Sequence, residues 1–325
     1  MELARRRLLQ CGIAAIAAGV GPRFARARNY PTKPVRIITG FPAGGLSDIL
    51  ARLLGQRLSE RLGQPFVIEN KPGAATNLAT AAVIRSPADG YTLLLATAMN
   101  AINATTYEHL NFNFINDAEP VASIVDAAFV LEVIPSLPVK TVPEFIAYAK
   151  ANPGKLNVAS GGIGSPEHVA AEFFKIMTGV DMVHVPYRGS GPAVVAMLGG
   201  EVQAYFGPIA PSIEHIRAER LRALAVTTAA RSESLPGVPA MSEFLAGYTV
   251  SAWQGVVAPK NTPPDVIATL NREINDALAE PKLKARFLDL GTVVLPGSPG
   301  DFAKMIAQDT EKWAKVVKTA GIKVS

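Results

Sequence analysis

The sequence predicts an α/β protein whose strands are mainly parallel and alternate with helices. Short apolar runs typical of buried strands recur along the chain, and stretches with apolar residues at helical spacing follow most of them. Twice, at residues 35–48 and 156–165, a strand runs into a glycine-rich loop that opens an amphipathic helix. The first N–H groups of a helix are unpaired and carry partial positive charge. Two such junctions in separate halves of the chain therefore suggest a clamp for a small anion.

The elements follow from periodicity and capping signals, in chain order. Apolar residues recur at helical spacing between residues 46 and 62, Thr141 and Glu144 have capping-box spacing, and Ser165 with Pro166 fits a capped helix start. The expected strands are residues 35–39, 66–69, 91–96, 121–125, 129–134, 156–159, 182–185, 202–206 and 221–227. The expected helices are residues 46–62, 76–85, 141–151, one from 166 onward, 193–198, 209–218, 264–279 and 299–319. This order predicts ligand sites at the carboxyl ends of parallel strands.

The N-terminal segment has the pattern of a secretory signal. Arginines at 5–7 precede an apolar run over residues 8–20, and small residues at 25 and 27 form a cleavage pattern. We therefore expect residues 1–27 to be removed on export, and the arginines also fit a twin-arginine signal. The run is too short and alanine-rich for a membrane anchor. Cys11 lies near its start, not at its end, which argues against a lipoprotein.

Removal of this leader changes the charge of the chain. The full sequence has 32 Lys and Arg against 27 Asp and Glu, but five arginines and one glutamate precede residue 28. The mature chain would carry 27 positive and 26 negative groups, so its charge gives no indication of nucleic-acid binding. Its only cysteine would leave with the leader, which excludes a disulfide, a thiol nucleophile and a thiolate metal site.

Seven motifs carry a family resemblance. They are residues 30–36 (YPTKPVR), 41–48 (FPAGGLSD), 69–74 (ENKPGA), 88–94 (ADGYTLL), 185–189 (VPYRG), 221–227 (LRALAVT) and 253–259 (WQGVVAP). In this order they resemble the Bug family, the periplasmic solute-binding proteins of tripartite tricarboxylate transporters. The resemblance implies a two-lobed Venus-flytrap fold, each lobe a mainly parallel sheet flanked by helices. Lobe 1 would combine residues 28–128 and 253–325, and lobe 2 would be residues 129–252.

The resemblance also implies a function. A periplasmic receptor of this family captures a small organic carboxylate by closing its lobes on it and delivers it to membrane permease subunits. We expect a monomer that has no cofactor, no metal, no nucleic-acid partner and no catalytic activity. A ligand-sensing protein that signals to a sensor kinase is the alternative. The sequence does not separate the two roles, because a permease and a kinase would recognise the same closed surface.

The expected binding residues lie on the two glycine loops and at neighbouring strand ends. In the family these loops hold a ligand carboxylate through backbone and hydroxyl groups, often with ordered water. The resemblance therefore implies contacts from Phe41, Ala43, Gly44, Gly45, Ser47, Thr97, Asn100, Ser160, Gly161, Gly162, Ser165, His168, Tyr187, Arg188, Phe206 and Gly207.

The glycine loops also have a purely structural explanation. Gly44 and Gly45 could simply permit a sharp turn, and the same applies to the second loop. Asp48 would repel a ligand carboxylate, whereas a carboxylate in the first helical turn favours the helix dipole. We therefore interpret Asp48 as structural.

Other candidates have comparable alternatives. Arg188 could bind a carboxylate through its planar fork or be an ordinary exposed arginine. His168 is equally well explained as a local capping group, and Thr97 and Asn100 as a plain turn at a strand end. Trp253 could form a wall of the cleft, but packing between the lobes is the preferred explanation.

Sequence differences from the family bear on the ligand. Gly207 follows Phe206 where many relatives carry an aspartate, so a carboxylate that could pair with a ligand ammonium is missing. This argues against amino-acid ligands. Four side chains, if near the cleft, favour a flat or hydrophobic carboxylate: Phe41, Met99, Tyr187 and Phe206.

An enzyme finds no support in the motifs. Residues 45–49 match a nucleophile elbow only in part, because the final glycine is missing. Neither a G-x-G-x-x-G nor a Walker A sequence occurs. The four histidines show no metal-ligand spacing, and no catalytic partner can be assigned to Ser47 or Ser165.

Overall fold

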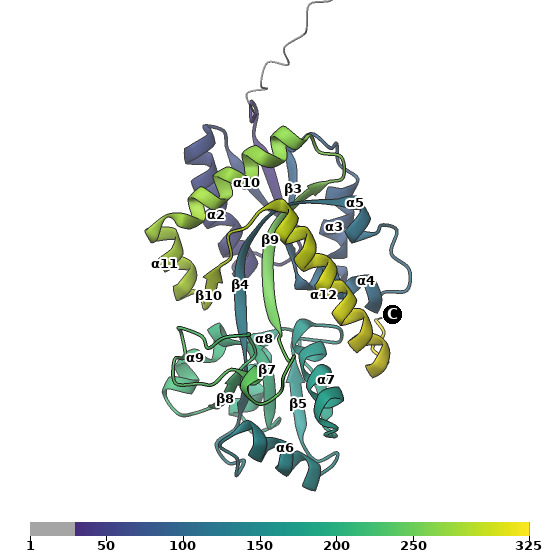
Figure 1. Cartoon of the computed structure of the whole chain (residues 1–325), viewed down its shortest axis with the longest axis vertical. Helices are drawn as coiled ribbons and strands as arrows, with labels where there is room; N and C mark the ends of the chain where they lie inside the picture. The colour runs from purple at the N-terminus through teal and green to yellow at the C-terminus, as the bar shows by residue number, and fades with distance from the viewer. Residues whose placement is uncertain (1–29, 325) are drawn as a thin grey trace, which may run out of the picture.

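The computed structural model describes residues 30–324 and shows two α/β lobes stacked along the long axis of the molecule (Figure 1). The leader expected at residues 1–27 lies outside the described residues. The strands are β1 (Val35–Thr39), β2 (Phe66–Asn70), β3 (Thr92–Thr97), β4 (Ala118–Val133), β5 (Asn157–Ser160), β6 (Val183–Pro186), β7 (Ala204–Pro208), β8 (Arg222–Val226), β9 (Ser251–Pro259) and β10 (Thr292–Val294).

The helices cover both faces of the sheet in each lobe. They are α2 (Leu46–Leu62), α3 (Asn77–Ile84), α4 (Ala98–Thr106), α5 (Phe114–Asp117), α6 (Val142–Ala151), α7 (Pro166–Thr178), α8 (Ser190–Leu198), α9 (Ile209–Arg217), α10 (Pro264–Ala279), α11 (Pro281–Asp289) and α12 (Pro299–Ala320), with short 3₁₀ helices at Ala74–Thr76 and Met241–Glu243. Within residues 30–324 no helix combines the length and apolar character that a membrane crossing requires.

Each lobe contains a parallel unit that ends at the junction between the lobes. In one lobe β2, β1 and β3 are parallel neighbours, and β9 and then β4 extend that sheet antiparallel. In the other lobe β7, β5 and β6 are parallel, and β4 is antiparallel to β7 and β8. The expected two-lobed α/β architecture is confirmed, and its antiparallel pairs all involve the strands β4 and β9.

Strand β4 passes from one lobe into the other, and it corrects a sequence prediction. Strands were expected separately at 121–125 and 129–134, but Ala118–Val133 is one strand of 16 residues. Its pairing changes from Ser251 of β9, opposite Ala128, to Pro208 of β7, opposite Phe129. Asp126 interrupts the apolar pattern without ending the strand. It is accommodated in the sheet, where burial raises the pKa of its carboxyl group.

Other differences lie near the cleft. Residues 97–100, weighed as a turn, form the start of α4, where the Asn100 side chain accepts the Thr97 N–H at 2.8 Å. Strand β9 was not predicted, because Gln254 and Gly255 break its apolar run. Helix α11 and strand β10 were also missed. The predicted helices at 46–62 and 264–279 agree with α2 and α10.

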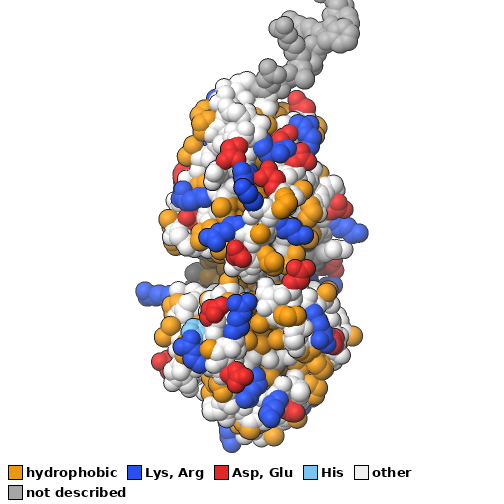
Figure 2. All heavy atoms as spheres, turned by 90° about the vertical axis from the view of Figure 1, so that its left-hand side faces the viewer, with side chains coloured by type: hydrophobic (Ala, Val, Ile, Leu, Met, Phe, Trp, Pro, Cys, Tyr) orange, Lys and Arg blue, Asp and Glu red, His pale blue; other side chains and the backbone are white. Residues whose placement is uncertain are grey.

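Helix α12 packs along both lobes. It starts beside the first lobe and reaches α7 of the second (Figure 1). Trp313 of α12 meets Phe173 of α7 edge to face with ring centroids 6.2 Å apart. The hydrophobic core is continuous through this junction, since Trp253, Phe302 and Trp313 belong to one buried cluster with Phe174 of the second lobe. In Figure 2 the lobes meet at a narrow waist, and side chains of both charges are scattered over the surface.

Candidate functional site

A cavity of about 430 Å³ lies between the lobes, at the carboxyl ends of β1, β3 and β5. It is lined by Phe41, Pro42, Gly45, Leu46, Ser47, Thr97, Ala98, Met99, Ala127, Phe129, Gly161, Ser165, Pro166, Glu167, Gly189, Ser190, Pro208, Ala252, Trp253 and Gln254. Both glycine loops contribute, as does β4 where it changes lobes. The wall is largely apolar, and its polar groups come from both sides, an arrangement typical of small-molecule sites.

The first glycine loop presents an uncapped helix start to this cavity. Gly45 is the N-cap residue of α2, and no side chain caps it. Among residues 30–324 no acceptor pairs with the N–H groups of Gly45, Leu46 or Ser47. The helix dipole adds partial positive charge at the same place. This loop therefore offers hydrogen-bond donors without any basic side chain.

Asp48 braces this loop from behind. Its carboxylate accepts hydrogen bonds from the Gly44 N–H and Asn70 Nδ2, each at 2.9 Å, and forms an ion pair with Arg52 at 2.9 Å. The hydrogen bond from Arg52 is the main reason that the pKa of Asp48 falls to about 2. Asp48 is structural, as its place in the first helical turn predicted. Because the Gly44 N–H donates to Asp48, it is not available to a ligand.

In the second glycine loop, side chains of the loop and of the helix start accept hydrogen bonds from the backbone N–H groups. Ser165 Oγ caps α7 by accepting the His168 N–H at 3.2 Å, and His168 Nδ1 accepts the Gly164 N–H at 3.1 Å. Ser160 Oγ accepts the Gly162 N–H at 3.1 Å. Gly162 has φ of +138°, a conformation that favours glycine. The two loops look alike in sequence, but only the first leaves its helix start uncapped.

Two stacked histidines support the second loop. The rings of His168 and His184 are 3.6 Å apart, and Ser160 Oγ lies 2.6 Å from His184 Nε2. Burial is the main cause that lowers the pKa of His168 to about 3 and of His184 to about 4. The positive charge of Lys175 lowers both further. Both rings are therefore neutral at pH 7 and hold the loop as hydrogen-bonding groups.

Acid should weaken the fold through this pair. Unfolded histidines bind protons near pH 6.5, whereas the folded ones bind them only near pH 3 and 4. The unfolded state thus holds more protons between these values, so stability falls as pH drops below 6.5. Allowing for the partial exposure of His184, we expect a loss on the order of 2 kcal/mol between pH 7.5 and pH 5. Denaturant titrations of wild type, His184→Gln and the exposed-site control His109→Gln test this. A His184→Gln profile as steep as that of the wild type and the control would contradict it.

Six of the predicted site residues line the cavity, namely Phe41, Gly45, Ser47, Thr97, Gly161 and Ser165. The others do not line it: Ala43, Gly44, Asn100, Ser160, Gly162, His168, Tyr187, Arg188, Phe206 and Gly207. Asn100 serves α4, and Arg188 is exposed. Tyr187 lies with its hydroxyl 3.4 Å from Glu201.

Strand alternation explains the placement of Phe206 and Gly207. Phe206 faces the core, with its ring 5.1 Å from that of Phe174. Gly207 lies on the opposite face beneath the ring of Tyr205, where an added Cβ would come within 2.0 Å of that ring. Glycine is therefore required at 207 by the tyrosine two residues earlier.

The sequence reasoning missed several residues of the cavity. Glu167 and Ser190 were not predicted as site residues, and Gln254 occurs only within the motif at residues 253–259. Gln254 Oε1 and Thr97 Oγ1 are buried without a hydrogen-bond partner in the described chain. A glutamine within an apolar run was a usable signal, since buried polar groups need partners. Trp253 lines the cavity and also packs against Phe302, so it fits both of the roles considered for it.

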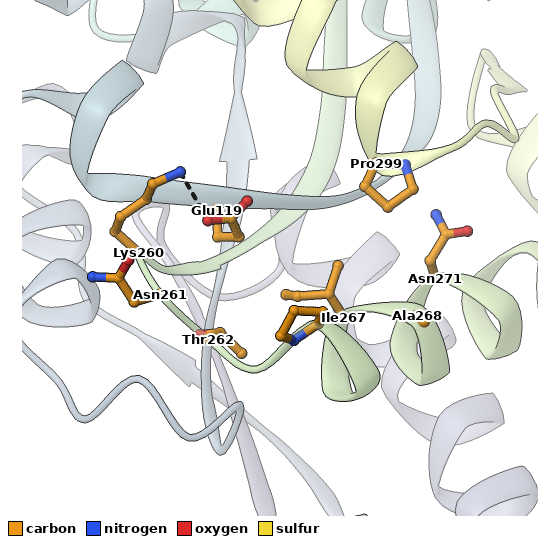
Figure 3. Close-up of a pocket in the computed structure, with 9 residues that line it drawn as sticks. Glu119, Lys260, Asn261, Thr262, Ile267, Ala268, Asn271 and Pro299 are labelled. Carbon is orange, nitrogen blue, oxygen red and sulfur yellow. Dashed lines mark ion pairs between the residues drawn. The ribbon is translucent and has the colours of Figure 1, made fainter.

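A second hollow lies on the first lobe alone (Figure 3). It has a volume of about 650 Å³ and involves the end of β9 and the start of α10. Lys260 there pairs with Glu119 at 2.9 Å. Asn271 donates to the backbone oxygens of Val121 and Gly297. These polar groups are already satisfied, so the cavity between the lobes is the better ligand site. The described residues hold no cluster of three or more metal-ligating side chains.

Comparisons with known proteins point to one family. Residues 50–322 match the sequence model described as the tripartite tricarboxylate transporter family receptor. Protein BugT of Bordetella pertussis (strain Tohama I) is 38% identical over 324 residues, 98% of each chain. The solved structure of R. palustris Rpa4515 with adipate has a TM-score of 0.80 at 36% identity and covers 90% of this chain and 99% of that one. MatC from Rhodopseudomonas palustris with bound malate has a TM-score of 0.76 at 30% identity, with coverages of 89% and 100%.

Proposed function

Because the chain belongs to the family of tripartite tricarboxylate transporter receptors, which includes the Bug proteins, we propose that it captures a small organic carboxylate between its lobes and delivers it to membrane permease subunits. Relatives solved with adipate and with malate support the carboxylate class. The family is one of solute-binding receptors, and we propose that this chain catalyses no reaction.

One observation carries the proposal: an uncapped helix start opens into a cavity between two lobes. The free N–H groups of Gly45, Leu46 and Ser47 can donate to a carboxylate, and the dipole of α2 favours its charge. No Lys, Arg or His belongs to the lining. The ligand carboxylate would therefore be held by N–H groups, hydroxyl groups and the helix dipole, with no basic side chain beside it. Phe41, Met99 and Trp253 suit an apolar ligand body.

We propose the lobe boundaries expected from the sequence, with residues 28–128 and 253–325 in one lobe and 129–252 in the other. The exchange of partners in β4 between Ala128 and Phe129 supports the first boundary. Closure would bend the chain there and near the start of β9. We further propose that the mature receptor is a periplasmic monomer. The leader pattern and the family support the location.

Binding of a carboxylate should stabilise the mature chain, residues 28–325. A ligand at 100 times its Kd raises the free energy of unfolding by about 2.7 kcal/mol. Thermal shift and calorimetry against mono-, di- and tricarboxylates, aromatic acids and amino acids measure this effect. Ser47→Ala should weaken binding of the best ligand about fivefold, which corresponds to one hydrogen bond.

Ser242→Ala is the matched control, because its hydroxyl bonds only to the Ala229 oxygen, 3.1 Å away, and lies outside the cavity. It should bind as the wild type does. A panel without any carboxylate that binds, or a Ser47→Ala variant with wild-type affinity for the best one, would contradict the proposed site.

A further inference from the structure

Glu167 places a buried carboxylate at the second glycine loop. Its side chain lines the cavity, and the residue is only 7% exposed. Ser190 Oγ donates to its Oε1 at 2.9 Å, and the Tyr205 hydroxyl lies 3.5 Å from the same oxygen. The carboxylate lies over Gly161, where an added Cβ would come within 3.1 Å of Oε1. The group is thus held in place by neighbours from three elements of the second lobe.

Glu167 has no counter-charge. Within residues 30–324 no Lys, Arg or His forms an ion pair with it, and His168 and Lys175 of the same helix lie against Glu172 instead. Asp48 at the first loop differs, because Arg52 pairs with it and its oxygens face away from the ligand side, toward Gly44 and Asn70. A buried carboxylate without a counter-ion favours a ligand group of positive charge beside it.

Glu167 is also the only charged side chain among the residues that line the cavity. The cavity therefore has a net negative charge before a ligand enters. A dicarboxylate would place its second negative charge in a site that already carries one. In a ligand with one carboxylate and one cationic group, the cation would offset the negative charge of Glu167. The remaining negative charge, on the ligand carboxylate, would lie at the free helix start of α2, where the helix dipole favours it.

Gln254 provides a second, independent observation. Its side chain lines the cavity from β9, and its Oε1 is buried without a hydrogen-bond partner in the described residues. An unpaired amide in the wall calls for a hydrogen-bonding group of the ligand, and an amine supplies the donor that its oxygen lacks. The cavity thus combines a row of donors at the first loop with unpaired acceptor capacity elsewhere in its wall.

We propose that the ligand is an amino-carboxylate, with its carboxylate at the α2 start and its protonated amine at Glu167. The inference rests on the proposed receptor function and names the ligand class of that same site. It reverses the expectation drawn from Gly207. The carboxylate missing at 207 is supplied from α7, and the Tyr205 ring, which fills the space over Gly207, directs its hydroxyl toward Glu167.

Matched ligand pairs test the charge rule. Adipate and 5-aminopentanoate differ by exchange of one carboxylate for an ammonium group, as do glutarate and 4-aminobutyrate, and succinate and 3-aminopropanoate. Leucine and 4-methylpentanoate differ by the amine alone. Calorimetry at pH 7 with the mature chain should show that the amino member of the best-fitting pair binds at least tenfold more tightly, as a charge-assisted hydrogen bond in a buried site implies.

Glu167→Gln keeps the size of the side chain and removes its charge. It should weaken binding of the amino-carboxylate about tenfold or more and improve binding of the paired dicarboxylate. Glu214→Gln, which removes the same charge from an exposed site of the second lobe, should leave both affinities unchanged. A thermal melt of each variant without ligand verifies that it is folded.

The outcomes separate this inference from the function on which it rests. A dicarboxylate that binds at least as tightly as its amino partner, with a ratio that Glu167→Gln does not change, would overturn the amino-carboxylate inference and leave the carboxylate receptor intact. Absence of binding by every carboxylate in both panels would overturn the receptor function, and the inference with it.

Discussion

Replacement of Trp253 by alanine is expected to lower the free energy of unfolding by about 3–5 kcal/mol and to weaken ligand binding at least tenfold. Trp253 is 2% exposed and belongs to the core cluster that joins the lobes. Its ring meets that of Phe302 edge to face at 5.4 Å, and its Nε1 donates to Asp309 at 2.7 Å. The same side chain lines the cavity, so its loss opens a void in both places.

Trp313→Ala separates the two effects. Trp313 is as deeply buried and lies in the same core cluster, but it does not line the cavity. We expect a comparable loss of stability with ligand affinity retained. Denaturant titration gives the first quantity and calorimetry of the folded variants gives the second. Equal binding by the wild type and Trp253→Ala would show that this tryptophan only packs between the lobes.

Replacement of Glu132 by glutamine should stabilise the protein in alkaline solution, on the order of 4 kcal/mol at pH 9. Glu132 lies on β4 and is fully buried. Ser212 Oγ donates to its Oε1 at 2.6 Å, while Oε2 has no partner in the described chain. Burial raises the pKa of this carboxyl group to about 8. A glutamine can keep the hydrogen bond from Ser212 without a charge.

The pH dependence gives this prediction its sign. The folded protein keeps the Glu132 proton until about pH 8, whereas the unfolded chain releases it near pH 4.5. Wild-type stability therefore decreases as pH rises from 4.5 through 8, and the variant lacks this decrease. Urea titrations at pH 5, 7 and 9 should show similar stabilities at pH 5 and a widening gap above it. A gap that is constant with pH would contradict the buried, protonated state.

The sequence predicted the architecture well because local signals and the fold agree. Caps at Thr141 and Ser165 start α6 and α7 where they were expected, and Ser298 caps α12 at the start of the helix expected over residues 299–319. The predicted division of β4 was wrong because Asp126 interrupts the apolar run of the sequence, whereas the sheet accommodates it. Whether a strand continues through a polar residue depends on its pairing with strands that are distant in the sequence. The periodicity of apolar residues gives no information on that pairing.

The candidate site was predicted only in outline, because the spacing of motifs along the sequence locates loops and strand ends but not the contacts of their side chains. The first loop was placed correctly at the cavity, but Gly44 donates its N–H to Asp48 instead of facing a ligand. The second loop resembles the first in sequence, yet Ser165 and His168 satisfy it internally. Glu167 was overlooked because nothing in the sequence indicates that Ser190 and Tyr205 surround it.

A crystal structure with the ligand that stabilises the mature chain most tests the central claim directly. We expect its carboxylate within hydrogen-bond distance of the N–H groups of Gly45, Leu46 and Ser47, enclosed between the lobes. A ligand seated instead in the hollow between Lys260 and Asn271 on the first lobe (Figure 3), with the cavity between the lobes empty, would contradict the account.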